Sequence, residues 1–194
     1  MKAIKRKKAS TIRVPEDCKT LNEAVKKVQQ DPTLTTIVLG KGKHKLKKEK
    51  GQRILPITSS VNIIGDPHFS KKEIVVVGGI FFGKEIPGNC HLQHLTLRQA
   101  KHSAVAGWSS FTMKDVLVER CGWHGVFAYG TGTVGRCTNV EVRHCGKCGV
   151  VAAGAASITL IGSKTSVHHN NSRGLAVIGS SSEILVVWPK KWFR

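Results

Sequence analysis

The chain has 194 residues, of which 31 are Lys or Arg and 12 are Asp or Glu, so its formal net charge is +19. Hydrophobic residues make up 40% of it, too many for a disordered chain despite this charge. No apolar run reaches the roughly 18 residues of a membrane helix, and the charged N-terminus leads into no hydrophobic region, so it is not a secretory signal. We therefore expect one soluble, intracellular domain, in an unspecified compartment, with six mostly reduced Cys residues.

The sequence divides into three parts. Residues 1–10 are a basic N-terminal arm, residues 11–187 the folded domain, and residues 188–194 an aromatic and basic C-terminal tail. Positive charge is not confined to the arm, because residues 98–194 hold 12 basic and 4 acidic residues. A charge of this size attracts polyanions, most strongly at low salt. The expected partner is an acidic polymer, either a polysaccharide or a nucleic acid, or an acidic protein surface.

The first third of the chain predicts a helix followed by short strands. Thr20 is a plausible N-cap and Glu23 completes a capping box, after which apolar residues recur at helical spacing. Asp31-Pro32 ends this helix, which therefore covers about 20–30. Three β-branched runs that precede glycine predict strands: 35–39, 61–64 and 74–77.

From residue 95 onward the sequence repeats, with steps of 21, 24 and 25 residues. The repeat aligns four triplets: Leu95-Thr-Leu97, Val116-Leu-Val118, Val140-Glu-Val142 and Thr165-Ser-Val167. The same offsets align a second column, which consists of Ala100, Cys121, Cys145 and Asn170, and a third, which consists of Ala104, Gly125, Gly149 and Gly174. Units of 21–25 residues with two or three strands and no helix are typical of coils of a parallel β-helix, in which like residues stack about 4.8 Å apart.

Alternation along the strands assigns side chains to the two faces of each coil. Leu95, Leu97 and their counterparts are expected inside, and the residues between them outside: Thr96, Leu117, Glu141 and Ser166. Glycines in register are expected at tight corners, where φ can be positive. Cys121, Cys145 and Cys137 are expected to be buried thiols, and Asn170 to bond the backbone of a turn.

The opening Ile12-Arg-Val-Pro-Glu-Asp-Cys-Lys-Thr-Leu-Asn-Glu-Ala-Val25, followed by Thr36 to His44, resembles that of right-handed β-helix proteins of the pectin-lyase-like superfold. The later Cys-Gly and His-His-Asn elements resemble the "right-handed β-helix region" proteins of algae and other protists. The resemblance covers residues 11 to 187 and implies an all-β, right-handed parallel β-helix solenoid with a short capping helix. It implies no single function, because this superfold hosts lyases, hydrolases, epimerases, adhesins and scaffolds.

An outward basic stripe is the main candidate for a binding site. Stacked coils bring together cations suited to a polymer of regular negative charge: Arg98, Arg120, Arg143, His144, Lys147, His168, His169 and Arg173. Three aromatic residues are candidates for stacking on sugars or bases: Trp108, Trp123 and Tyr129. An ordinary solvated face, with aromatics that close turns, explains the same pattern about as well. The leading hypothesis is a non-enzymatic binding module or scaffold.

The sequence offers less support for an enzymatic function. Polysaccharide hydrolysis needs a pair of carboxylates on one face of the coils, and a calcium-dependent lyase needs several oxygen ligands for the ion. The repeat region supplies neither. A calcium-free polyuronate lyase or epimerase stays open, with Arg143 and His168, or Arg120 and His144, as cation and base and with Tyr129 as acid. We therefore expect no catalytic residue, no metal ligand and no cofactor, and we read the single Cys-x-x-Cys motif as structural.

A third hypothesis is a structural subunit of a larger assembly. A β-helix has unpaired strand edges at its ends. The predicted helix covers one end, and Trp188, Trp192 and Phe193 are available at the other, where they either form a cap or mediate self-association or docking.

Overall fold

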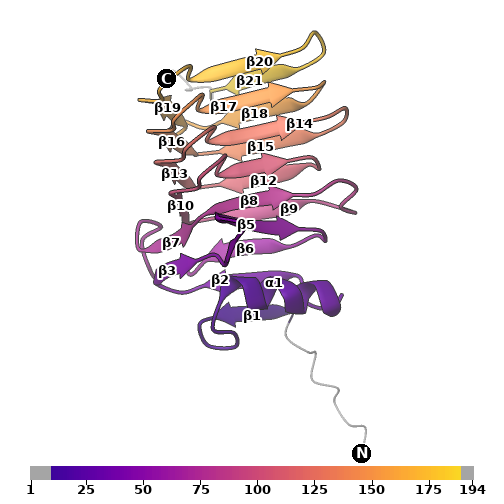
Figure 1. The fold of residues 1–194 in the computed structure, drawn as a ribbon, viewed down its shortest axis with the longest axis vertical. Coiled ribbons are helices and arrows are strands. Elements are labelled where there is room, and N and C mark those ends of the chain that lie inside the picture. The colour runs from indigo at the N-terminus through magenta and orange to yellow at the C-terminus, as the bar shows by residue number, and fades with distance from the viewer. Residues whose placement is uncertain (1–9, 189–194) are drawn as a thin grey trace, which may run out of the picture.

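The computed structural model describes residues 10–188, which form a parallel β-solenoid of about seven turns with one short helix (Figure 1). Each complete coil contributes one strand to each of three sheets, and like strands of successive coils pair in parallel. This confirms the predicted fold class. No helix in residues 10–188 has the length and hydropathy needed to cross a membrane.

The first sheet has eight strands: β1 (Thr11–Val14), β2 (Thr36–Leu39), β6 (Asn62–Gly65), β9 (Cys90–Gln93), β12 (Phe111–Lys114), β15 (Val134–Thr138), β18 (Ser157–Ile161) and β21 (Glu183–Val187). The second has six: β3 (Gly42–Lys45), β7 (Ile74–Val77), β10 (Thr96–Arg98), β13 (Leu117–Glu119), β16 (Glu141–Arg143) and β19 (Ser166–His168). The third has seven: β4 (Lys48–Glu49), β5 (Gln52–Ile57), β8 (Gly79–Phe82), β11 (Val105–Gly107), β14 (Val126–Tyr129), β17 (Val150–Ala153) and β20 (Leu175–Ile178). The β4–β5 pair is antiparallel.

Helix α1 (Leu21–Gln30) lies beside β1 at the N-terminal end of the solenoid (Figure 1). The Thr20 hydroxyl accepts a hydrogen bond from the Glu23 N–H at 3.2 Å, which satisfies one free donor of the first turn. Its buried face packs into the core and consists of Leu21, Ala24, Val25 and Val28. The predicted capping helix is therefore confirmed.

Residues that the predicted repeat aligned are paired with one another between successive coils. Leu97 pairs with Val118, Val118 with Val142, and Val142 with Val167, all along the second sheet. Inward side chains of all three sheets form one continuous core. Phe82 and Phe111, both fully buried, stack there with ring centroids 5.6 Å apart.

Two outward positions of the second sheet are buried, contrary to the prediction. Thr96 and Leu117 are almost fully enclosed, whereas Glu141 and Ser166 are partly exposed as expected. The connection 66–73 explains Thr96, because the Thr96 hydroxyl donates to the Lys71 carbonyl at 2.8 Å. A chain crossing outside the sheet therefore covers this part of its face.

The prediction that glycines in register occupy positive-φ corners is confirmed at one corner of the coils and is wrong at another. Between the second and third sheets, the residues with left-handed backbone conformation are not glycines. They are Gln99, Arg120, His144 and His169, with φ of 57°, 54°, 53° and 51°. Positive-φ glycines occupy the turn after the third sheet, at Gly130, Gly154 and Gly179. Gly125 and Gly149 have another role, since a Cβ at Gly149 would lie 2.4 Å from the Val167 side chain.

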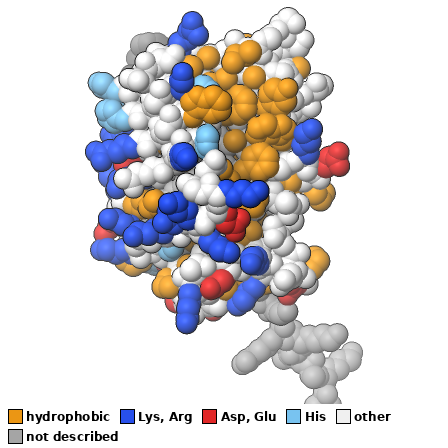
Figure 2. Space-filling model, viewed as in Figure 1, with side chains coloured by type: hydrophobic (Ala, Val, Ile, Leu, Met, Phe, Trp, Pro, Cys, Tyr) orange, Lys and Arg blue, Asp and Glu red, His pale blue; other side chains and the backbone are white. Residues whose placement is uncertain are grey.

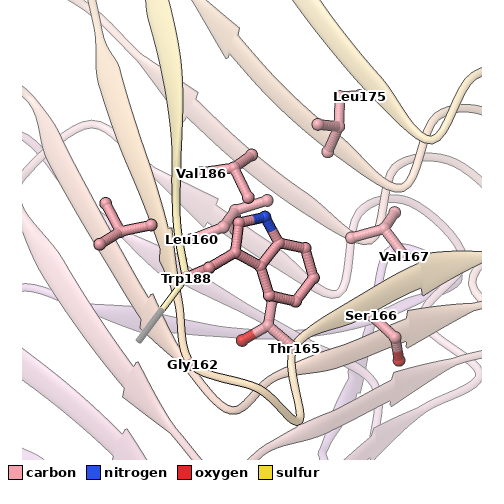
Figure 3. Close-up of a pocket in the computed structure, with 9 residues that line it drawn as sticks. Leu160, Gly162, Thr165, Ser166, Val167, Leu175, Val186 and Trp188 are labelled. Carbon is pink, nitrogen blue, oxygen red and sulfur yellow. The ribbon is translucent and has the colours of Figure 1, made fainter. Parts of the chain in front are cut away.

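The C-terminal end of the described chain exposes the apolar interior of the last coil. A hollow of about 400 Å³ lies there, lined by core-type side chains that include Leu160, Val167, Leu175 and Val186 (Figure 3). Trp188 lies across it and is 63% exposed. The hollow continues the core, and none of the described residues that line it carries a charge to orient a small ligand. Self-association or docking at this end stays a hypothesis, and Trp192 and Phe193 lie outside the described residues.

Candidate functional site

Arg98, Glu119 and Arg143 are in register on neighbouring strands of the second sheet. Glu119 is buried and accepts hydrogen bonds from both guanidinium groups. Arg98 Nε lies 2.6 Å from Oε1, and Arg143 Nη2 lies 2.8 Å from Oε2. Arg143 also donates to Glu141 at 2.8 Å. The two arginines therefore already have carboxylate partners.

The charged state of Glu119 depends on this arrangement. Burial opposes ionisation and is the largest single influence, but the hydrogen bonds and charges of Arg143 and Arg98 together outweigh it. The pKa of Glu119 is therefore below its ordinary value. In return, the hydrogen bond to Glu119 raises the pKa of Arg143.

His168 is next in this column, in register with Arg143. His168 Nε2 lies 3.5 Å from a Glu141 carboxylate oxygen. His168 Nδ1 lies 2.6 Å from His169 Nδ1, so one of these nitrogens donates to the other. Two of the predicted binding residues thus contact each other directly.

The corner between the second and third sheets carries exposed basic side chains. We call the following set the basic corner: Lys101, Arg120, His144, Lys147, His169 and Arg173. All six are exposed. Backbone bonds between coils fix the corner, such as Gly122 N–H to the Ala100 carbonyl at 2.8 Å and Gly146 N–H to the Cys121 carbonyl at 2.7 Å. The Asn170 side chain accepts from Cys145 N–H and donates to the Val142 carbonyl, as predicted.

The Lys and Arg side chains of the basic corner have no partner among the described residues and so can meet a ligand. Arg120, His144 and His169 stand one above another at the left-handed position and border a shallow polar hollow of about 410 Å³. Within residues 10–188, the side chains of Lys101, Arg120, Lys147 and Arg173 form no ion pair or hydrogen bond. The arginines of the second sheet, Arg98 and Arg143, are paired with carboxylates. The arginines of the basic corner, Arg120 and Arg173, have no such partner among the described residues.

The three predicted aromatic residues lie together on the outer face of the third sheet. Trp108 and Tyr129 have ring centroids 5.5 Å apart. Trp123 is linked to them through the rings of His124 and Phe127, which were not among the predicted binding residues. Strand alternation was the available signal, since Phe127 lies between the inward Val126 and Ala128. In Figure 2, hydrophobic side chains gather over the upper coils and are bordered by Lys, Arg and His.

All six cysteines are free and buried. The pKa of Cys121 is raised by its hydrogen bond with the Cys145 thiol and by burial, and burial raises that of Cys137 to about 12. No cluster of three or more His, Cys, Asp or Glu able to hold a metal ion occurs in the described ranges.

Two other acidic groups, Asp115 and Asp66, are bound within the fold. Asp115 accepts from Lys71 and from His94 at 2.7 Å each, while the second His94 ring nitrogen faces the Phe69 carbonyl at 2.8 Å. This cluster fastens the connection 66–73 to the coils. Asp66 likewise accepts from the His68 backbone and ring within a turn.

The structure thus defines the protein as a parallel β-solenoid with a basic corner beside an aromatic face. Comparisons with protein-family models, curated proteins and solved structures found no match to the chain. Function therefore has to be argued from the site itself.

Proposed function

We propose that this protein is a non-enzymatic binding module that binds an acidic polymer along its basic corner. The observation that carries the proposal is the contrast between two neighbouring columns. Arg98 and Arg143 are paired with carboxylates, both with Glu119 and Arg143 also with Glu141. In contrast, four side chains project from successive coils without a partner among the described residues: Lys101, Arg120, Lys147 and Arg173. Cations repeated along one axis match a ligand whose negative charges also repeat.

Binding to a panel of polyanions across a salt series tests this function. The panel contains single-stranded and duplex nucleic acid, alginate and a sulfated glycan. The test variant replaces Lys101, Arg120, Lys147 and Arg173 by Gln. Its matched control replaces four exposed cations elsewhere that also lack partners in the described chain, Lys84, Lys114, Arg136 and Lys164, so both variants lose the same charge.

The corner variant should lose most of its affinity, and the slope of log K against log salt should fall by roughly one for each contact removed. The control should change little. Equal losses in both variants would mean diffuse attraction and would contradict the proposal. New absorbance at 235 nm with a polyuronate would support the lyase alternative, and isolation only within a complex would support the subunit alternative.

Two further points belong to the proposal. The Cys-Gly and His-His-Asn elements of the later coils support membership of the right-handed β-helix region type found in algae and other protists. The six free thiols support an intracellular, reducing setting.

A further inference from the structure

A row of aromatic rings crosses the outer face of the third sheet, next to the basic corner. We call Trp123, His124, Phe127 and Tyr129, all from one coil, the aromatic row. Successive ring centroids are 5.1, 5.8 and 6.1 Å apart, with interplanar angles of 25°, 23° and 30°. The rings are therefore stacked side by side with similar orientation.

Rings of the neighbouring coils hold the row in place. Trp108 packs against Phe127 and Tyr129 at 5.9 and 5.5 Å. On the other side, Tyr129 lies over Gly154, where an added Cβ would come within 2.9 Å of the ring. Even so, Trp123 and Tyr129 at the two ends of the row are 48% and 43% exposed. Positioned rings with free surface lose little conformational entropy when a ligand stacks on them.

The row begins where the basic corner ends. Lys147 and Trp123 occupy the same position in successive coils, since the Lys147 N–H bonds the Trp123 carbonyl at 2.9 Å. Backbone bonds likewise align Arg173 with Cys148, and Cys148 with His124. A ligand that follows the corner thus meets cations and flat rings side by side.

The surrounding side chains favour one class of ligand. The segments that build this surface, 101–108, 122–129, 146–153 and 171–178, contain no Asp, Glu or Gln, and Asn171 is their one amide side chain. Lys and Arg only donate hydrogen bonds, so the hydroxyl hydrogens of a sugar would find few acceptors here. Bases need only a flat partner, because every base has a π face.

We propose that the aromatic row and the basic corner together bind single-stranded nucleic acid, with bases stacked on Trp123 and Tyr129 and phosphates on Lys147 and Arg173. The strand must be single, because a duplex hides the base faces. This inference rests on the proposed function and adds the class of polymer.

Fluorescence titration with oligo-dT, oligo-U, a DNA duplex and alginate tests the proposal. Trp123→Ala and Tyr129→Ala should each weaken single-strand binding by about tenfold with an unchanged salt slope. Trp123→Phe keeps a flat ring and should retain most of the affinity. Phe69→Ala, which removes an exposed ring elsewhere, is the control. Circular dichroism checks that each variant is folded.

The outcomes separate the two proposals. Binding that depends on the corner but not on Trp123 or Tyr129, or that is equal for single strand and duplex, would overturn this inference and leave the proposed function standing. Tighter binding of alginate, weakened by Trp123→Ala, would show a sugar platform and also overturn it. If no polymer binding depended on the corner, both proposals would fall.

Discussion

Arg143 holds the Glu119 carboxylate with two nitrogens, since Nη2 and Nε lie 2.8 and 3.0 Å from the same oxygen. The other carboxylate oxygen accepts a hydrogen bond from Arg98, which lies in the neighbouring coil on the opposite side. One buried acid thus joins three successive coils. The two arginines therefore stabilise the solenoid, in contrast to the Lys and Arg side chains of the basic corner, which have no partner within residues 10–188.

Glu119→Gln should destabilise the protein by about 2 kcal/mol, because it removes charge-assisted hydrogen bonds from a buried position. Urea unfolding at pH 7 measures this. Glu141→Gln is the control, and its more exposed contact with Arg143 should contribute less than about 1 kcal/mol. Equal effects of the two substitutions would contradict a special role for Glu119.

Stability should fall in acid. The pKa values of Glu119 and Asp115 are both lowered: burial raises each, but the bonds from Arg143 and Arg98, and from Lys71 and His94, outweigh it. A carboxyl group with a lowered folded-state pKa contributes stability above its unfolded value of about 4 and loses it as pH falls through the folded value. The urea midpoint should therefore drop mainly below about pH 4, and less steeply in Glu119→Gln. Identical profiles would contradict this assignment.

Gly125, Gly149 and Gly174 form one column of the repeat, and of these only Gly174, in the last coil, should tolerate substitution by alanine. A Cβ at Gly149 would lie 2.4 Å from Val167 Cγ1 and 2.8 Å from the Gly174 carbonyl, so Gly149→Ala should cost about 1–3 kcal/mol. At Gly174 the nearest atoms would be 3.7 Å away, and Gly174→Ala should be neutral or slightly stabilising. Thermal unfolding compares the two, and a cost at Gly174 equal to that at Gly149 would refute the packing explanation.

The repeat was readable from the sequence because residues such as Val118 and Val142 stack on their own counterparts, so one register constrains every coil. The burial of Thr96 could not be predicted from the sequence, because it depends on a contact with Lys71 in a connection outside the repeat. The left-handed corner at Arg120 and His144 was missed for a similar reason. Bonds between coils fix that corner, and local preference alone favours glycine there.

The candidate site was predictable as a list of residue types but not as a set of partners. The sequence indicates that Arg98 and Arg143 lie on one outward stripe, but only the side-chain geometry shows that both bond the Glu119 carboxylate. Charge counting treats Arg98 and Arg120 alike, whereas the fold pairs one and exposes the other.

Thiol labelling should be slow in the folded protein. Burial raises the pKa of Cys90 and brings that of Cys137 to about 12, so little reactive thiolate exists near neutral pH. Iodoacetamide at pH 8 followed by mass spectrometry should show these two unmodified, and all six cysteines modified in denaturant. Rapid labelling of Cys137 without denaturant would contradict its position in the core.

Removing the Glu119 charge should strengthen polymer binding, because it releases Arg98 and Arg143 next to the basic corner. Glu119→Gln should raise affinity for the polymer about two- to fivefold at low salt and steepen the salt slope. Glu183→Gln is the matched control, since it makes the same change in net charge at an exposed carboxylate of β21 in the first sheet. If both variants gain equally, net charge alone governs binding. A gain specific to Glu119 means that the polymer contacts the second sheet at the edge of the corner.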